Sequence, residues 1–324
     1  MRGSHRVVVR NGRVQFKFDV RRNITILRGN SATGKTTLIG MIADYERNGR
    51  ESGIELSCDK PCVVLSGRHW QRELSFVSDS IVFVDEGNAF TSSYDFAAAM
   101  RDSDNYYVIA TRESLFALPY SVDEVYGIRN TGRTTSKYPQ VKRLYSSFYH
   151  LYGPQRDEPF VPDLVVVEDS NSGFQFFSAA CEKCALPCVS AGGKSNVCRV
   201  VRESQAQNVL VIADGAAFGP EMEQASLLGV SKNVRLFLPE SFEWLVLKSG
   251  LVSDQDVASV LANPSEFIES SEYFSWERFF AAFLAERTKD TYLQYGKSLL
   301  NEAYLGERET EAILSGVPDV GIRP

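Results

Sequence analysis

One short segment near the N-terminus has the residue types and spacing needed to hold a phosphate chain. Glycines stand at Gly29 and Gly34, and Lys35 and Thr36 follow directly. Glycine lets the chain turn sharply so that backbone N–H groups surround phosphate oxygens, and a helix starting at the lysine adds favourable partial charge. The lysine can then reach the β and γ phosphates, and the threonine hydroxyl can coordinate Mg²⁺. The predicted phosphate-binding residues are Gly29, Asn30, Ser31, Ala32, Thr33, Gly34, Lys35, Thr36 and Thr37.

Two adjacent carboxylates, Asp85 and Glu86, follow an apolar run at residues 81–84. If that run is a buried parallel strand, Asp85 can hold Mg²⁺ through water and Glu86 can polarise an attacking water molecule. Together, the glycine loop and the acidic pair resemble the Walker A and Walker B motifs of P-loop ATPases that carry an additional catalytic glutamate. The resemblance implies that Lys35 and Glu86 are catalytic, that Thr36 and Asp85 hold Mg²⁺, and that the cofactors are ATP and Mg²⁺. GTP remains the alternative nucleotide.

Two polar residues, Thr111 and Arg112, follow the next apolar run at residues 106–110. In the ATPase class just named, a polar residue at this strand end often senses the γ phosphate, and Thr111 occupies the matching place. Arg112 could act as an arginine finger toward a second chain, which would require a homo-oligomer. A plain surface turn is the alternative interpretation of both residues.

A second pair of acids, Glu168 and Asp214, stands at the ends of two further predicted strands. With the glycine turn at residues 191–197, they resemble the Toprim fold of topoisomerases, primases and overcoming-lysogenization-defect nucleases over roughly residues 163–245. The resemblance implies that Glu168 is a general acid/base and that both acids lie at a metal site. The second aspartate of the family's D-x-D pair is Ala216 in this chain. Because oxygen ligands supply nearly all the affinity for Mg²⁺, this departure favours a degenerate, binding-only module over an active nuclease. A generic βα module with acidic strand ends is the alternative.

Two other groups of residues could form sites, and the first of them is irregularly spaced. The first group consists of four cysteines, Cys181, Cys184, Cys188 and Cys198. Their thiolates could bind zinc, although cysteines on a helix are more commonly small core residues. The second group recurs at helical intervals and predicts a packed polar face of a helix. Its members are Tyr292, Tyr295, Lys297, Asn301 and Tyr304.

The elements that must position these residues alternate between strand and helix, which predicts an α/β fold with parallel sheets. An Asn11-Gly12 turn predicts a β-hairpin before the P-loop sheet, because this pair supplies the positive φ angles of a two-residue turn. From residue 253 onward only helices are predicted. The expected domains are a P-loop NTPase domain at 1–130, a linker at 131–162, a Toprim-like α/β module at 163–250 and an all-helical C-terminal region at 251–324.

Composition sets further limits on function. Apolar residues make up 44% of the 324 residues, so folded domains are expected throughout. The net charge is −6, but it is unevenly distributed. Residues 1–150 contain 21 basic and 16 acidic side chains, whereas residues 151–324 contain 14 basic and 25 acidic side chains. No apolar run is long enough to span a bilayer, and six cysteines beside a nucleotide motif fit reduced thiols. We therefore expect a cytoplasmic ATPase without a membrane partner, whose nucleotide state controls a module that contacts nucleic acid or a partner protein. An ATP-regulated nuclease and a nucleotide-gated scaffold without turnover are the alternatives.

Overall fold

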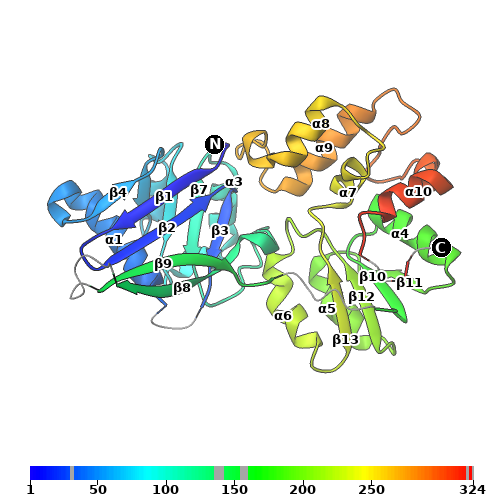
Figure 1. Ribbon diagram of the computed structural model, residues 1–324, viewed down its shortest axis with the longest axis horizontal. Coiled ribbons are helices and arrows are strands. Elements are labelled where there is room, and N and C mark those ends of the chain that lie inside the picture. The colour runs from blue at the N-terminus through cyan, green and yellow to red at the C-terminus, as the bar shows by residue number, and fades with distance from the viewer. Residues whose placement is uncertain (30–32, 135–141, 154–159, 319–320, 323–324) are drawn as a thin grey trace. The chain divides into compact units, whose positions relative to one another are not determined.

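The computed structural model describes residues 1–29, 33–134, 142–153, 160–318 and 321–322. The chain forms two compact units (Figure 1). The first unit contains residues 1–153 and 265–274, and the second contains residues 154–264 and 275–324. Each unit has its own β-sheet, so each is described by itself.

The first unit is built on one mixed sheet, to which the described residues contribute nine strands. Its antiparallel part carries the N-terminal hairpin, and its other part is parallel. In spatial order the strands are β4 (Glu55–Ser57), β1 (His5–Arg10), β2 (Val14–Val20), β9 (Lys142–His150), β8 (Val125–Thr134), β3 (Ile24–Leu27), β7 (Tyr106–Ala110), β6 (Ile81–Val84) and β5 (Cys62–Val64).

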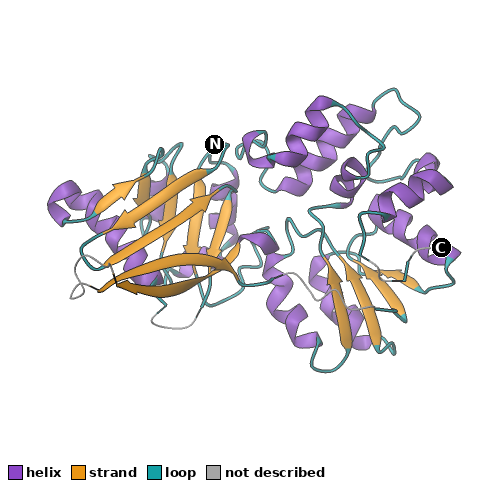
Figure 2. Ribbon diagram, viewed as in Figure 1, coloured by secondary structure: helices purple, strands orange, loops and turns teal. Residues whose placement is uncertain are grey.

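The parallel strands are continuous apolar runs because helices cover both of their faces. Strand β6 illustrates this arrangement. Ile81 and Phe83 pack in one core with helix α1 (Lys35–Asn48), whereas Val82 and Val84 pack in a second core with helices α2 (Trp70–Leu74) and α3 (Tyr94–Arg101). Figure 2 shows the helices and the strands of this unit. The predicted strands at residues 24–27, 81–84 and 106–110 are confirmed.

The N-terminal hairpin is present, but its turn is not the predicted one. Gly12 does not have a positive φ angle. Instead, the side-chain oxygen of Asn11 accepts hydrogen bonds from the N–H groups of Arg13 and Val14, at 2.9 Å each. The Asn11 N–H also donates to the Val14 carbonyl. The asparagine side chain therefore closes the turn, as Asx turns do.

The boundary between the two units, after Gly153, lies within the predicted linker at residues 131–162, but most of the described residues before it belong to strands. Strand β8 continues to Thr134, strand β9 occupies Lys142–His150, and the two strands pair antiparallel from Tyr126↔His150 to Thr134↔Lys142. Their serine, threonine and tyrosine residues are suited to a strand with one face in water. Because that composition also occurs in loops, strands β8 and β9 could not be predicted from the sequence.

The second unit has a four-stranded parallel sheet in its described residues, and the predicted strands of this module are confirmed. In spatial order the strands are β11 (Cys188–Ser190), β10 (Leu164–Val167), β12 (Asn208–Ile212) and β13 (Asn233–Phe237). The connecting helices are α4 (Ser172–Lys183), α5 (Lys194–Glu203) and α6 (Met222–Leu228).

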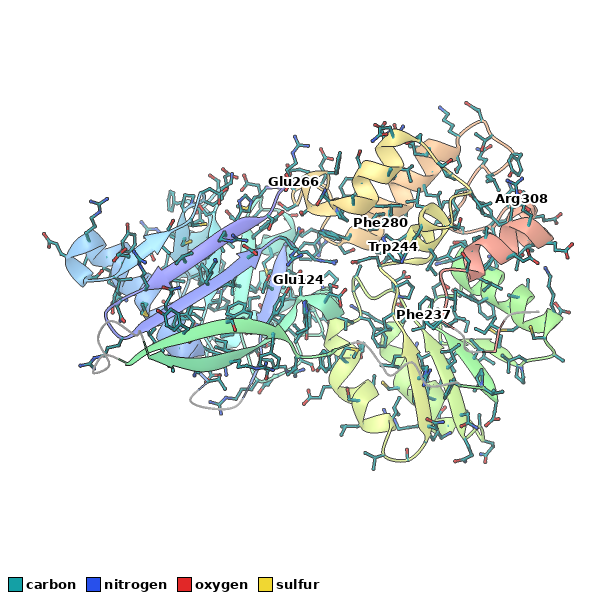
Figure 3. All side chains as sticks on the ribbon, in the orientation of Figure 1. Glu124, Phe237, Trp244, Glu266, Phe280 and Arg308 are labelled. Carbon is teal, nitrogen blue, oxygen red and sulfur yellow. The ribbon has the colours of Figure 1, made fainter. Side chains whose placement is uncertain are left out.

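The part after β13 is helical, as predicted. Trp244 of α7 and Phe280 of α9 belong to this part (Figure 3). Its helices are α7 (Phe242–Lys248), α8 (Gln255–Ala262), α9 (Trp276–Thr288) and α10 (Glu307–Leu314). The described chain also contains short 3₁₀ helices, which are η1 (Gly49–Ser52), η2 (Ala89–Ser92), η3 (Val122–Glu124), η4 (Gly219–Glu221), η5 (Pro264–Glu266) and η6 (Glu302–Leu305). In the described part of the chain, no helix is both long and apolar enough to cross a membrane.

Residues 265–274 form a strap that belongs to the first unit, so the predicted C-terminal region is not one block. The amino group of Met1 donates to the Ser270 hydroxyl at 2.9 Å, and the Ser270 N–H donates to the Met1 carbonyl. The Asn23 side chain, directly before β3, donates to the carbonyls of Ser270 and Tyr273. These long-range hydrogen bonds between backbone and side chain leave no pattern in the sequence.

Candidate functional site

The glycine loop connects the end of β3 to the start of α1. Gly29 and Gly34 have φ angles of 144° and 101°, which other residues rarely adopt. Gly34 precedes α1 and has no side chain with which to cap it, so the first N–H groups of the helix face the loop. The predicted residues Asn30, Ser31 and Ala32 lie outside the described residues.

Lys35 reaches back over this loop and is 4% exposed. Its Nζ atom donates to the Gly29 carbonyl at 2.5 Å and lies 3.5 Å from the Thr33 hydroxyl. The same atom lies 3.6 Å from Oε2 of Glu86. The ammonium group is therefore held at the mouth of the loop, next to the carboxyl end of the sheet.

The acidic pair after β6 meets the start of α1. The Thr36 hydroxyl donates to Oδ1 of Asp85 at 3.5 Å, and the Glu86 N–H donates to the same oxygen at 2.8 Å. Thr37 is exposed on α1. The structure thus brings Lys35, Thr36, Asp85 and Glu86 together at one edge, as the motif spacing predicts.

Strand β7 lies between β3 and β6 and delivers Thr111 and Arg112 to the same edge. The Arg112 guanidinium donates twice to Glu86, from Nη2 to Oε1 at 2.7 Å and from Nε to Oε2 at 3.2 Å. It therefore engages a carboxylate of its own chain. The hydrogen bond from Arg112, with the nearby Lys35 charge, holds the pKa of Glu86 below its usual value. The Thr111 hydroxyl instead exchanges hydrogen bonds with the backbone of Glu113.

Sequence reasoning missed Arg28, which follows β3 and is 7% exposed. Its guanidinium donates to the Arg112 carbonyl at 3.3 Å and to the Ser114 hydroxyl at 3.1 Å, and it also donates to the Tyr152 hydroxyl at 3.3 Å. Arg28 thereby fixes the turn that carries Arg112. The only sign of Arg28 in the sequence was its position directly after the apolar residues of a predicted strand.

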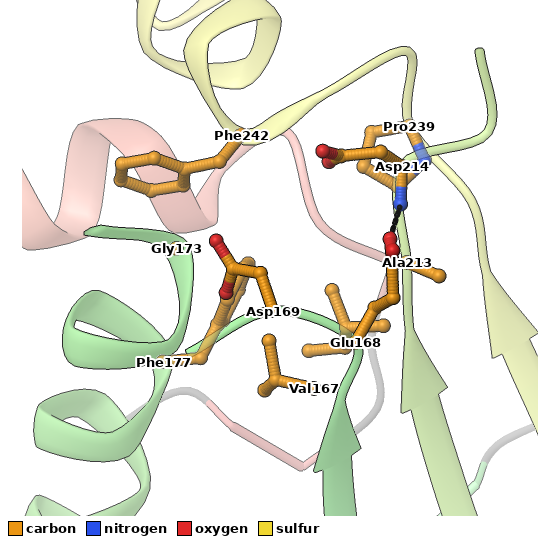
Figure 4. Close-up of a pocket in the computed structure, with 10 residues that line it drawn as sticks. Val167, Glu168, Asp169, Gly173, Phe177, Ala213, Asp214, Pro239 and Phe242 are labelled. Carbon is orange, nitrogen blue, oxygen red and sulfur yellow. Dashed lines mark hydrogen bonds between the residues drawn. The ribbon is translucent and has the colours of Figure 1, made fainter. Parts of the chain in front are cut away.

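The second unit contains an acidic pocket at the carboxyl ends of its two central strands (Figure 4). Glu168 follows β10 and Asp214 follows β12, and the Asp214 N–H donates to Oε2 of Glu168 at 3.2 Å. The cavity has a volume of about 20 Å³, which is room for one water molecule. Parallel strands that diverge to opposite sides of a sheet leave such a crevice at their carboxyl ends.

Burial is the main influence on the acids of this pocket. It raises the pKa of Asp214 well above its ordinary value, and the Glu277 and Glu168 carboxylates add to the effect. Burial also raises the pKa of Glu168. In Figure 4 the Asp169 carboxylate lies beside Gly173, and it accepts a hydrogen bond from the Phe174 N–H at 2.9 Å. Asp169 therefore caps the start of α4.

An ion pair between Glu243, which follows the pocket residue Phe242, and Lys297 was not predicted. Glu243 is completely buried, and the Lys297 ammonium lies 2.9 Å from its Oε1 atom. The predicted helix face around Lys297 is wrong, because α9 ends at Thr288 and residues 292–301 are not α-helical.

The cysteines do not form the hypothetical zinc site in the described part of the chain, where no group of three or more histidine, cysteine or acidic residues could hold a metal. Cys181 of α4 and Cys188 of β11 interact through their thiols, which raises the pKa of the former. Cys184 donates to the Ile322 carbonyl, and Cys198 is buried on α5. They act as small packing residues.

No protein-family model matches this chain, and no curated protein sequence is similar to it. The functional assignment therefore depends on the residues and their geometry.

Proposed function

We propose that the first unit binds ATP with Mg²⁺ and hydrolyses it. The observation that carries the proposal is the convergence of Lys35, Thr36, Asp85 and Glu86 at the carboxyl edge of one sheet, within the distances given above. A buried ammonium beside a glycine turn and an uncapped helix start fits a triphosphate. A hydroxyl paired with a carboxylate fits Mg²⁺, which prefers oxygen ligands.

Each residue has a definite role in this proposal. Lys35 leaves its carbonyl partner to neutralise the β and γ phosphates, and Thr36 and Asp85 hold the metal ion. Bound Mg²⁺ supplies charge neutralisation on the phosphate oxygens. Glu86 accepts a proton from the attacking water molecule, and Arg112 positions the Glu86 carboxylate through its two hydrogen bonds.

We also propose that the second unit is the module that responds to the nucleotide and contacts nucleic acid or a partner protein. The position of Glu168 and Asp214 at the carboxyl ends of two adjacent parallel strands, where open α/β sheets bind ligands, supports a binding role. Ala216 and the capping role of Asp169 disfavour a nuclease, because they leave Glu168 and Asp214 without further ligands for a metal.

The test is phosphate release from ATP and Mg²⁺ by the full chain, alone and with DNA or RNA, at low and high protein concentration. GTP in a parallel series decides the nucleotide preference. We expect turnover that requires Mg²⁺ and that Lys35→Ala abolishes. If all of these conditions leave ATP intact, hydrolysis is excluded. If calorimetry also detects no ATP binding, the assignment of the loop fails.

A further inference from the structure

The antiparallel part of the first sheet has one face on the core and one face in solvent. On the core side, Phe18 of β2 and Phe148 of β9 stack with 4.2 Å between their ring centres. Because successive residues of a strand point to opposite faces, their neighbours in sequence point away from the core. Lys17, Ser147 and Tyr149 occupy such outward positions, and all three are exposed.

The strand register brings two cations and two aromatic rings together around Ser147. Strand β9 lies between β2 and β8 (Figure 1), so Ser147 pairs with Lys17 on one side and with Arg129 on the other. Tyr145 and Tyr149 are the next outward residues along β9. Neighbouring strands lie about 4.8 Å apart, and alternate residues of one strand lie about 6.7 Å apart. We call these five residues the outer sheet face.

Tyr149 forms a flat platform on this face. It lies opposite Gly127 of β8, and a Cβ atom at Gly127 would lie only 2.6 Å from Cε1 of the tyrosine ring. The ring therefore extends across the strand at a position where only glycine leaves room, and Tyr149 is still 38% exposed. The Arg129 guanidinium lies 5.0 Å from the centre of the same ring. Unpaired nucleic-acid bases stack on both aromatic rings and guanidinium planes.

The outer sheet face is positively charged, although the chain has a net charge of −6. In sequence, strands β8 and β9 contain no acidic residue and four lysine or arginine residues, which are Arg129, Arg133, Lys142 and Arg143. The acids of the nearby strands β2 and β4 are Asp19 and Glu55, and each forms an ion pair with an arginine of β1. A local excess of positive charge attracts polyanions.

We infer that the outer sheet face binds a single-stranded nucleic acid. Lys17 and Arg129 neutralise its phosphates, and a base stacks on the platform of Tyr149. A duplex fits less well, because its bases are stacked on one another and offer the ring no free surface. An acidic peptide would use the two cations and leave the ring without a partner. The inference goes beyond the proposed function and does not depend on it, because the binding requires no ATP.

The experiment follows the fluorescence anisotropy of a labelled oligothymidylate during titration with the full chain, without ATP or Mg²⁺. We expect a Kd of about 1–100 μM at physiological salt, the range of sequence-independent binding. A duplex of the same length should bind at least about fivefold more weakly, which is the effect of one stacked base. Polyglutamate at the same charge concentration should not displace the oligothymidylate.

Variants of the outer sheet face separate stacking from charge. Tyr149→Leu keeps an apolar side chain over the glycine and should weaken binding at least about fivefold, whereas Tyr149→Phe keeps the ring and should bind like the original protein. Lys17→Gln should reduce the slope of log K against log salt by about 0.7, the contribution of one phosphate contact. The matched controls are Tyr94→Leu, at an exposed tyrosine of α3, and Arg47→Gln, at an exposed arginine of α1. Both should leave affinity and slope unchanged.

Three results would overturn the inference. The first is no binding at about 100 μM protein. The second is a duplex or polyglutamate bound as tightly as the single strand. The third is binding that neither Tyr149→Leu nor Lys17→Gln changes, which would place the strand on another part of the chain. If circular dichroism shows that Tyr149→Leu does not fold, Lys17→Gln and Arg129→Gln decide the matter, since salt slopes equal to that of the original protein overturn the inference and reduced slopes support it.

Discussion

If the first unit hydrolyses ATP as we propose, replacement of Glu86 by glutamine should separate catalysis from binding. Glutamine keeps the size of the side chain and one oxygen that can accept from Arg112, but it cannot take a proton from water. Loss of a general base costs about 10²–10⁴-fold in rate. Since each tenfold change corresponds to about 1.36 kcal/mol, this is roughly 3–5 kcal/mol in the activation barrier.

The same substitution should improve ATP binding. In the structure, Lys35 lies 3.6 Å from Oε2 of Glu86, and this ion pair competes with the phosphates for the ammonium. Lys35 is 4% exposed and the Glu86 side chain is 26% exposed, so the pair is only partly screened by solvent. A pair of this kind is worth about 1 kcal/mol. We therefore expect the Kd for ATP to fall by about fivefold while turnover falls by at least a hundredfold.

The assay combines continuous phosphate release with the titration of a fluorescent ATP analogue in the presence of Mg²⁺. Glu113→Gln is the matched control, because Glu113 is exposed and uses only its backbone in the Thr111 turn. That control should leave both quantities within twofold of the original protein. Turnover by Glu86→Gln within threefold of the original protein would refute the role of Glu86 as the base. A large loss of ATP affinity would refute the competition for Lys35.

Three further predictions concern the two sites. Arg112→Ala should lower turnover about tenfold and move the acidic limb of the pH–rate profile to higher pH, because Arg112 holds the pKa of Glu86 down. Arg112→Lys should not restore the rate, since lysine cannot donate from a planar fork. A pH–rate profile of Arg112→Ala equal to that of the original protein would contradict the positioning role. Asp85→Asn should raise the Mg²⁺ concentration needed for half-maximal turnover at least tenfold, and the same Mg²⁺ dependence as the original protein would contradict Asp85 as a metal-holding residue. Because the pKa of Asp214 is raised in the folded state, the folded protein binds more protons than the unfolded chain, so the free energy of unfolding should rise as the pH falls from 7.5 toward 5. Asp214→Asn should flatten this dependence in urea titrations, and an equally steep slope would show that other groups cause it.

The buried parts of the fold were predictable because they leave a pattern in the sequence. Strands β6 and β7 are unbroken apolar runs followed by polar residues, so both the strands and the meeting of their ends could be predicted. Strands β8 and β9 were hidden because an antiparallel pair with one wet face contains many polar residues. The hairpin turn was placed correctly, but Asn11 closes it by a side-chain mechanism that a two-residue pattern does not reveal.

The candidate sites also contain some residues that could be predicted from the sequence and others that could not. Residues grouped by a motif, such as Lys35 and Thr36, could be predicted because the loop and the helix hold them close in sequence. Glu243 and Lys297 are 54 positions apart, and the helical spacing around Lys297 does not point to Glu243, so only the folded chain brings them together. The bidentate contact between Glu86 and Arg112 depends on side-chain conformation at two neighbouring strand ends, which spacing alone does not determine.

The strap at residues 265–274 has a consequence for how the protein can be divided. The chain crosses from one unit to the other three times, so neither unit is a single continuous piece of sequence. A truncation after Gly153 would deprive Asn23 of both of its acceptors, directly before the strand that leads into the glycine loop. A division of the protein between its two units therefore has to keep residues 265–274 together with residues 1–153.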